Sequence, residues 1–218
     1  MQHRAPLFPI WIDKLVLIIA ALLAGGAVYF VVLVAYATSP VTTSAGYQPR
    51  QPVPYSHAMH AGQLGIDCRY CHFAVERGAF AVVPPTETCM NCHAHIKVTS
   101  EKLALVRESF ASGMPVRWVR VHDLPDFVYF NHSAHVTRGI GCVSCHGRID
   151  KMEEVYQYSP LSMGWCLDCH RQPERYLRPQ ESVTSMDWKA DGDQLELGRR
   201  LKEEQGINPS TDCYTCHR

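Results

Sequence analysis

The sequence of 218 residues predicts a mostly irregular chain with short α-helices, preceded by one N-terminal transmembrane helix. Three observations lead to this fold class. An uncharged apolar stretch lies near the N-terminus, and most of the 14 prolines and 14 glycines lie after residue 38, where they interrupt regular elements. The ten cysteines form five CxxC pairs with none left over. Such a chain has a limited hydrophobic core of its own, so another group must fill its interior.

The apolar stretch covers residues 15–37, LVLIIAALLAGGAVYFVVLVAYA, and contains no charged residue. A helix of this length spans a hydrocarbon layer of roughly 30 Å. Ala35-Tyr36-Ala37 resembles a signal-peptide cleavage site, but the run exceeds the usual signal core of about 7–15 residues. We therefore predict a membrane anchor at 15–37 and, by its Ser, Thr, Gly and Pro content, a linker at 38–54.

Histidine follows every CxxC pair. The motifs are CRYCH (68–72), CMNCH (89–93), CVSCH (142–146), CLDCH (166–170) and CYTCH (213–217). Two thiols at this spacing reach the two vinyl groups of one porphyrin, and the next histidine becomes the proximal iron ligand. The sequence thus predicts five covalently bound haem c groups and the fold of a multihaem cytochrome c. The attachment residues are Cys68, Cys71, Cys89, Cys92, Cys142, Cys145, Cys166, Cys169, Cys213 and Cys216, and the proximal ligands are His72, His93, His146, His170 and His217.

Zinc is the alternative explanation of the cysteine pairs, because the Cys71–Cys89 and Cys145–Cys166 spacings also fit paired CxxC zinc sites. The fifth pair, Cys213 and Cys216, would then lack a partner. Histidine occupies 12 of 218 positions, so its presence after all five pairs by chance has a probability on the order of 10⁻⁶ or less. The pattern therefore favours haem.

An internal repeat predicts distal iron ligands. YSHAMHAGQLGIDCRYCH and FNHSAHVTRGIGCVSCH each place HxxH ten or eleven residues before a CxxCH, and a second CxxCH follows. We read residues 55–93 and 130–170 as two di-haem modules. Residues i and i+3 of a helical turn are neighbours, so one HxxH can serve two haems. The predicted pairs are His57 with His72, His60 with His93, His132 with His146, and His135 with His170.

The fifth haem, bound within about 195–218, lies outside the repeat. His122 is our first candidate for its distal ligand. Met114, Met163, Met186 and His95 stay open, and a methionine would raise the potential of that haem.

The remaining segments lead to further expectations. Helices are predicted near 99–111 and 193–205, and a hairpin from 116–121 and 126–130. Arginines near the motifs are candidates to offset haem propionate charges: Arg69, Arg138, Arg148 and Arg171. The formal net charge of zero indicates no nucleic-acid partner.

The segments YSHAMHAGQLGIDCRYCH, PPTETCMNCH, RVHDLPDFVYFNHSAHV, GCVSCHGRIDKMEEV and LSMGWCLDCHRQPE resemble the pentahaem cytochrome c subunit of alternative complex III. The resemblance runs from the anchor to the last CxxCH. It implies a respiratory electron-transfer subunit, not an enzyme on its own, within a quinol-oxidising membrane complex. The implied partners are integral-membrane quinol-binding subunits, an iron–sulfur subunit and a monohaem cytochrome c. The implied acceptors are a c-type cytochrome, a cupredoxin or an oxidase.

Haem attachment to CxxCH takes place outside the bacterial cytoplasmic membrane, so residues 1–14 are expected inside and 55–218 on the periplasmic side. Two other functions stay open. One is a multihaem reductase with an open catalytic haem, which requires a five-coordinate iron. The other is a membrane quinol dehydrogenase similar to small tetrahaem anchor cytochromes, in which one haem itself contacts quinol.

Overall fold

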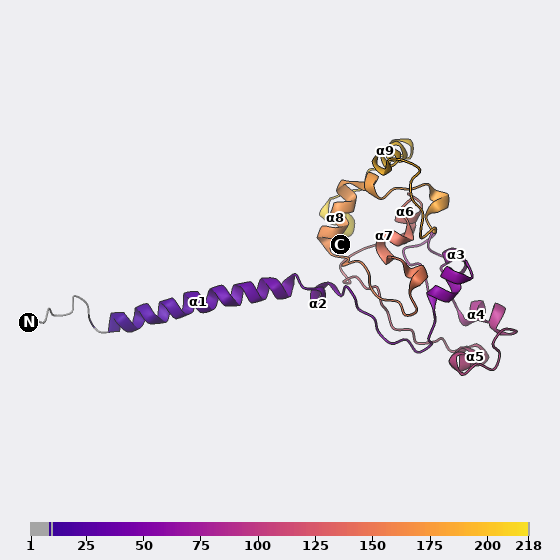
Figure 1. Cartoon of the computed structure of the whole chain (residues 1–218), viewed down its shortest axis with the longest axis horizontal. Coiled ribbons are helices and arrows are strands. Elements are labelled where there is room, and N and C mark those ends of the chain that lie inside the picture. Colours follow the sequence, from indigo (N-terminus) through magenta and orange to yellow (C-terminus); the bar gives the residue numbers. More distant parts are fainter. Residues whose placement is uncertain (1–8, 10, 218) are drawn as a thin grey trace, which may run out of the picture. The chain divides into compact units, whose positions relative to one another are not determined.

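The computed structural model describes residues 9 and 11–217, and the chain divides into two units, Met1–Thr43 and Ser44–Arg218. The first unit contains α1 (Trp11–Ala37) and the single-turn α2 (Pro40–Thr43) (Figure 1). No residue of α1 is buried, and the helix is long and apolar enough to cross a membrane. One N-terminal apolar helix of this kind fits a single-pass membrane anchor.

The helix starts at Trp11, earlier than the predicted Leu15. Asp13 lies in its first turn, where a carboxylate interacts favourably with the positive end of the helix dipole. Residues 11–14, which include the charged Asp13 and Lys14, therefore extend the helix instead of ending it. Most of the predicted cytoplasmic segment, residues 1–8 and 10, lies outside the described residues.

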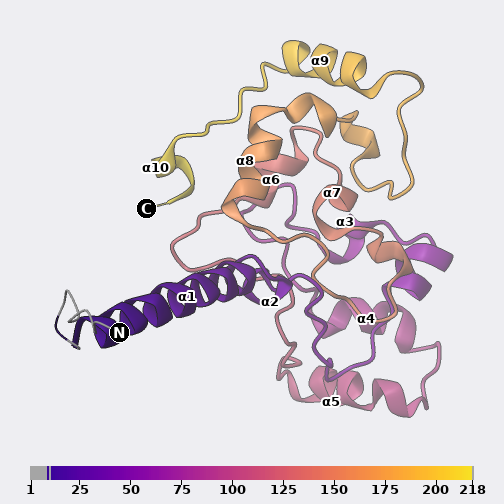
Figure 2. The same cartoon turned by 60° about the vertical axis from the view of Figure 1, so that its left-hand side comes forward.

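The second unit is built from short helices joined by irregular chain (Figures 1 and 2). Each CxxCH motif lies on or at the end of one: α3 (Cys68–Cys71), α4 (Thr86–His93), α7 (Cys142–His146), α8 (Met163–Arg171) and α10 (Cys213–Cys216). The other helices are α5 (Ala104–Ser112), α6 (His132–Val136) and α9 (Gln194–Glu204). Single turns complete the fold: the π-helical η1 (Ala58–Gln63) and the 3₁₀ turns η2 (Glu101–Leu103), η3 (Ile149–Lys151), η4 (Pro173–Arg175) and η5 (Gln180–Ser182).

Local capping explains where several of these short helices begin. Asp67 accepts a hydrogen bond from the backbone N–H of Arg69 at the start of α3, and Ser162 accepts one from Trp165 at the start of α8. Asn131 caps α6 through the N–H of Ser133. Such caps satisfy N–H groups that a short helix leaves unpaired. Side-chain caps thus mark the starts of α3, α6 and α8, whereas α4, α7 and α10 begin without one.

The apolar core of the second unit consists of small separate clusters. Their buried members are Val53, Val106 and Val116; Val75, Val136 and Val183; and Leu177, Leu201 and Ile207. None of these trios matches the core of a conventional domain of this length, in agreement with the prediction that another group fills the interior.

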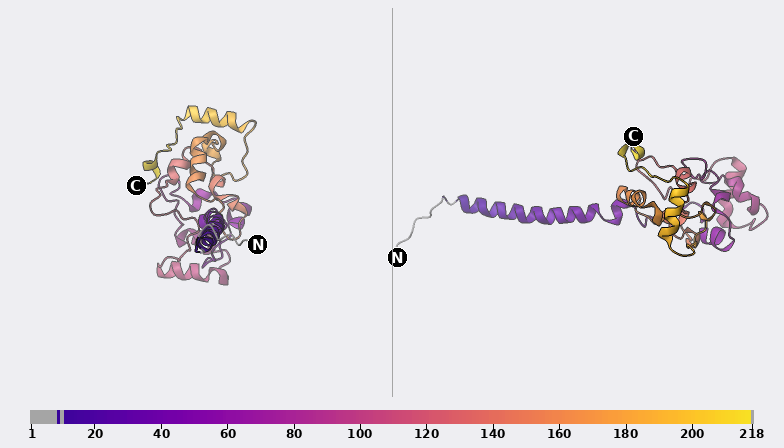
Figure 3. Two further views of the ribbon diagram at one scale, coloured as in Figure 1. Left: turned by 90° about the vertical axis from the view of Figure 1, so that its left-hand side faces the viewer. Right: turned by 90° about the horizontal axis from the view of Figure 1, so that it is seen from above.

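The two predicted longer helices are confirmed. The 99–111 segment forms η2 followed by α5, and the 193–205 segment forms α9. Helix α9 packs on η4 and lies at the edge of the unit (Figure 3). At the closest point, an added Cβ on Gly198 would lie 1.9 Å from the Glu174 carbonyl oxygen. Only glycine permits this approach.

The predicted hairpin is wrong: in the described part of the chain no strand forms at 116–121 or 126–130. The Gln51 side chain takes the place of a strand partner, because its amide donates to the Val119 carbonyl and accepts from the Val119 N–H at 2.8 and 3.0 Å. The second segment pairs elsewhere, through an isolated bridge between Val128 and His217. Side-chain pairing of this kind leaves no periodic signal in the sequence.

Candidate haem-binding site

Each motif helix brings its two cysteines and its histidine together within one or two turns. None of the ten cysteines forms a disulfide. In the described part of the chain no group of three or more His, Cys, Asp or Glu side chains is arranged to hold a metal ion. The paired CxxC motifs therefore do not converge as the zinc alternative requires, and each motif stands as a separate attachment point.

The two predicted modules make the same aromatic contacts. Tyr55 meets His57 edge-on at 4.9 Å between ring centroids and stacks on His60 at 4.5 Å. Phe130 likewise meets His132 edge-on at 4.8 Å and lies over His135 at 4.5 Å. The aromatic residue two positions before HxxH thus fixes both imidazoles. Sequence reasoning gave it no role, although it recurs visibly in YSHAMH and FNHSAH.

Two of the predicted ligand pairs have the separation that an iron between them requires. The ring centroids are 6.2 Å apart for His60 and His93 and 6.0 Å apart for His135 and His170. Two imidazoles that each bind a metal at about 2 Å have ring centroids roughly 6 Å apart. These two sites therefore fit a bis-histidine haem iron, which is low-spin and suited to electron transfer.

The Nδ1 atoms of most predicted ligands contact backbone carbonyls. The distances to these carbonyl oxygens are 2.7–3.0 Å for His60 (Ser56), His72 (Val82), His93 (Ile96), His132 (Ala79), His135 (Asn131) and His170 (Ser210), and 3.4 Å for His217 (Phe127). A carbonyl only accepts, so Nδ1 must donate its proton, and the neutral ring keeps the Nε2 lone pair free. Metal-binding histidines have this arrangement, because the second hydrogen bond fixes the ring and raises its basicity.

His57, His122 and His146 lie apart from this pattern. The His146 Nδ1 is 3.2 Å from the His122 Nε2, and their ring centroids are 4.4 Å apart. That separation is too short for an iron between the rings. His122 therefore occupies the position that a backbone carbonyl takes at the other ligands. The Nδ1 of His57 is buried without a hydrogen-bond partner.

Burial keeps the central histidines neutral. It lowers the pKa of His57 to about 4 and that of His146 to about 3, with smaller effects from neighbouring histidines. Burial also lowers the pKa of His122 and His135. The neutral imidazole is the form that binds a metal. The environment of these rings thus favours ligation.

The motif helices are neighbours in an order that differs from their order in the sequence. The Asn91 side chain of α4 donates to the Tyr70 hydroxyl of α3 at 3.0 Å, so α4 and α3 adjoin. Burial, and after it Cys89, raises the pKa of Cys71. A hydrogen bond between the Cys68 and Cys142 side chains lowers the pKa of Cys68 and raises that of Cys142, so α3 also adjoins α7. Helix α3 therefore lies between α4 and α7.

The same kind of contact continues toward the C-terminus. Burial raises the pKa of Cys145 to about 12, with further effects from Cys169 and Cys166 on α8. Burial, and then Cys216 on α10, raises the pKa of Cys166. The five motif helices follow one another as α4, α3, α7, α8 and α10, a succession that can be followed in Figure 2.

The candidates for the sixth ligand of the fifth haem are dispersed. The ring neighbour of His217 is Phe127, at 5.8 Å. His95 is exposed, and Met114 and Met163 are 64% and 65% exposed. His122 contacts His146. The assignment of His122 to the fifth haem stays a prediction.

The predicted propionate-binding arginines are held mainly by protein groups. Arg69 pairs with Asp67 and Glu76, and Arg148 pairs with Asp150. Sequence reasoning missed Arg178, which is 7% exposed, lies over the Trp188 ring and donates to the Ser185 carbonyl.

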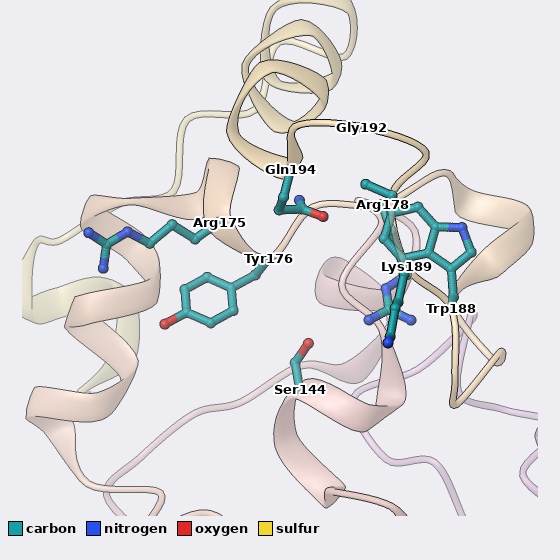
Figure 4. Close-up of a pocket in the computed structure, with 9 residues that line it drawn as sticks. Ser144, Arg175, Tyr176, Arg178, Trp188, Lys189, Gly192 and Gln194 are labelled. Carbon is teal, nitrogen blue, oxygen red and sulfur yellow. The ribbon is translucent and has the colours of Figure 1, made fainter.

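A cavity of about 460 Å³ lies beside Arg178, next to the third motif. Figure 4 shows the Ser144 hydroxyl and the Gln194 amide directed into it, with Lys189 beside Arg178. No acidic residue lines it. An added Cβ on Gly141, directly before Cys142, would lie 2.4 Å from the Arg178 guanidinium carbon. Arg178 thus supports the start of the third motif from outside.

The repeated motif helices and their imidazole sets define a cytochrome c with several covalently bound haems. Residues 128–218 match the family model "Cytochrome c7 and related cytochrome c". The chain is 30% identical over 176 residues to the menaquinone reductase multihaem cytochrome c subunit of Nitratidesulfovibrio vulgaris (strain Hildenborough), covering 78% of each protein. The chain belongs to this family of multihaem cytochrome c subunits associated with quinol oxidoreductases.

Proposed function

We propose that this chain binds five haem c groups and relays electrons between a quinol-oxidising membrane complex and an acceptor on the periplasmic side. The acceptor classes are a c-type cytochrome, a cupredoxin or an oxidase. Haem iron, when bound, supplies a centre that alternates between ferric and ferrous forms. The chain itself attaches, orients and shields these centres, and is not an enzyme on its own.

The observation that carries the proposal is the unbroken succession of motif helices from α4 to α10. Thiols of successive motif helices interact electrostatically, and the helices follow one another in Figure 2, which supports porphyrins that lie next to one another. In this arrangement the haems of His93 and His217 are the two ends. We propose these ends as entry and exit, with the pairs His57–His72, His60–His93, His132–His146 and His135–His170 as axial ligands.

Haem content gives the first test. Intact-mass measurement of the purified chain is expected to show five covalently attached haems. A Cys213→Ser/Cys216→Ser double variant is expected to retain four, and its other haem spectra are expected to be unchanged. Five haems in this variant, or fewer than five in the unmodified chain, would contradict the stoichiometry.

Electron relay is tested in the intact membrane complex. Addition of a quinol is expected to reduce all five haems. Stopped-flow absorption in the haem α-band measures this reduction. A quinol-site inhibitor is expected to abolish this reduction, whereas dithionite still reduces every haem. If quinol reduces none of the haems of this chain, the relay proposal is wrong.

A second candidate function is relay in the opposite direction, toward quinone, and the relative's name, menaquinone reductase, favours it. The same preparation distinguishes the two. With the haems reduced beforehand, a menaquinone analogue oxidises them rapidly if electrons flow to quinone. Slow oxidation by the analogue, together with rapid reduction by quinol, supports flow away from quinol.

A further inference from the structure

One loop supplies hydrogen-bond acceptors to imidazoles of both modules. The Val82 carbonyl accepts from Nδ1 of His72 at 2.7 Å, and the Ala79 carbonyl accepts from Nδ1 of His132 at 2.8 Å. His72 belongs to the first repeat and His132 to the second. We call residues 78–82 the bridging loop.

The bridging loop also holds the start of the second module. The backbone N–H of His132 donates to the Ala79 carbonyl at 3.1 Å, and that of Ser133 donates to the Gly78 carbonyl at 3.1 Å. These are first-turn N–H groups of α6, which have no backbone partner within their own helix; the N–H of Ser133 is shared with the Asn131 side chain. Val75, just before the loop, packs with Val136 of α6. A displacement of the loop therefore displaces His132.

Val82 adopts a backbone conformation that its side chain disfavours. Its φ is +61°, in the left-handed region where a β-branched residue is an outlier. Such strain persists only where surrounding contacts impose it. Here the imposed feature is the direction of the Val82 carbonyl toward the His72 ring.

We propose that the bridging loop is a shared positioning element that fixes one axial imidazole in each module and so couples the potentials of the two haems at the module junction. The proposal rests on the ligand pairs proposed above, His57–His72 and His132–His146. Hydrogen bonding to Nδ1 raises the basicity of the ligand, and a more basic ligand favours ferric iron. Opening of the loop removes both hydrogen bonds and raises both potentials.

The test compares Val82→Pro, Val82→Gly and Val83→Gly in the purified holoprotein. Proline fixes φ near about −65°, which turns the Val82 carbonyl away, whereas glycine adopts the observed φ freely. Redox titration with chemical mediators is expected to show upward shifts for the His72 and His146 haems in Val82→Pro and unchanged values for the His93 and His170 haems. In Val82→Gly both potentials are expected to equal those of the unmodified protein. The same result is expected for the Val83→Gly control.

A second measurement applies if Val82→Pro does not fold. In the reduced, diamagnetic protein, ¹⁵N-histidine NMR follows exchange of the Nδ1 protons with deuterium. Because one loop opening frees both rings, the Nδ1 protons of His72 and His132 are expected to respond together. Val82→Gly is expected to change both exchange rates by the same factor, and Val83→Gly to leave both rates unchanged. Independent responses of the two rings, or a potential shift confined to the His72 haem, would overturn the proposal.

Neither measurement uses quinol or the membrane complex, so failure of the relay function leaves this test intact. Failure of the ligand pairs is recognised separately, because His57→Ala and His132→Ala would then leave the low-spin spectra unchanged.

Discussion

Replacement of His60 by alanine is expected to leave one haem five-coordinate. His60 faces His93 at the 6.2 Å separation that an iron between the rings requires, so its loss removes the sixth ligand of that haem. Electron paramagnetic resonance is expected to show that one haem in five is high-spin. The reduced variant is expected to bind about one equivalent of carbon monoxide. The unmodified protein is expected to bind none, which would also argue against a reductase with an open haem.

Gln63→Ala is the matched control, because Gln63 lies in the same turn η1 as His60 but is exposed. Its spectra are expected to equal those of the unmodified protein. His60→Met is expected to restore a low-spin iron with a raised potential, as thioether ligation does. Unaltered spectra in His60→Ala would remove this residue from the ligand set.

Local patterns in the sequence were sufficient for the helices at the motifs, the anchor, α5 and α9. CxxCH, a long uncharged run and 3.6-residue periodicity are all contained within one segment. The HxxH pairs also rest on a local pattern, because their spacing relative to CxxCH repeats, and their role as iron ligands stays a prediction. The structure places His60 and His135 opposite His93 and His170, at separations that fit those predicted pairs.

Features that depend on backbone groups distant in sequence were not predictable. The carbonyls of Ala79 and Ser210 accept from His132 and His170 across 53 and 40 residues, and a carbonyl has no residue-type signature. The order of the motifs in space belongs to the same class, because α3 lies between α4 and α7 only through tertiary contacts. The hairpin failed for a related reason, since the Gln51 side chain satisfied Val119 in place of a strand.

Replacement of Gly198 by alanine, outside the motifs, is expected to destabilise the protein measurably. The added Cβ would meet Glu174 backbone atoms at 1.9, 2.6 and 2.8 Å, and backbone cannot yield as a flexible side chain can. Overpacking of this kind costs about 1–3 kcal/mol, more than the roughly 0.5–1 kcal/mol that alanine gains over glycine within a helix. Urea unfolding followed by far-ultraviolet circular dichroism measures the net loss.

The loss of stability is expected to affect the haem sites of His170 and His217, because α9 leads into the segment that contacts the first and carries the second. Ser210, shortly after α9, accepts from His170 at 2.7 Å, and Cys213 follows three residues later. Loosening of α9 is therefore expected to shift the potential of the His170 haem and to broaden the signals of the His217 haem, while the His93 haem stays unchanged. Glu203→Ala, on an exposed position of the same helix, is expected to change stability by less than about 0.5 kcal/mol. If Gly198→Ala were as stable as Glu203→Ala, the contact between α9 and η4 would not support the C-terminal haem sites.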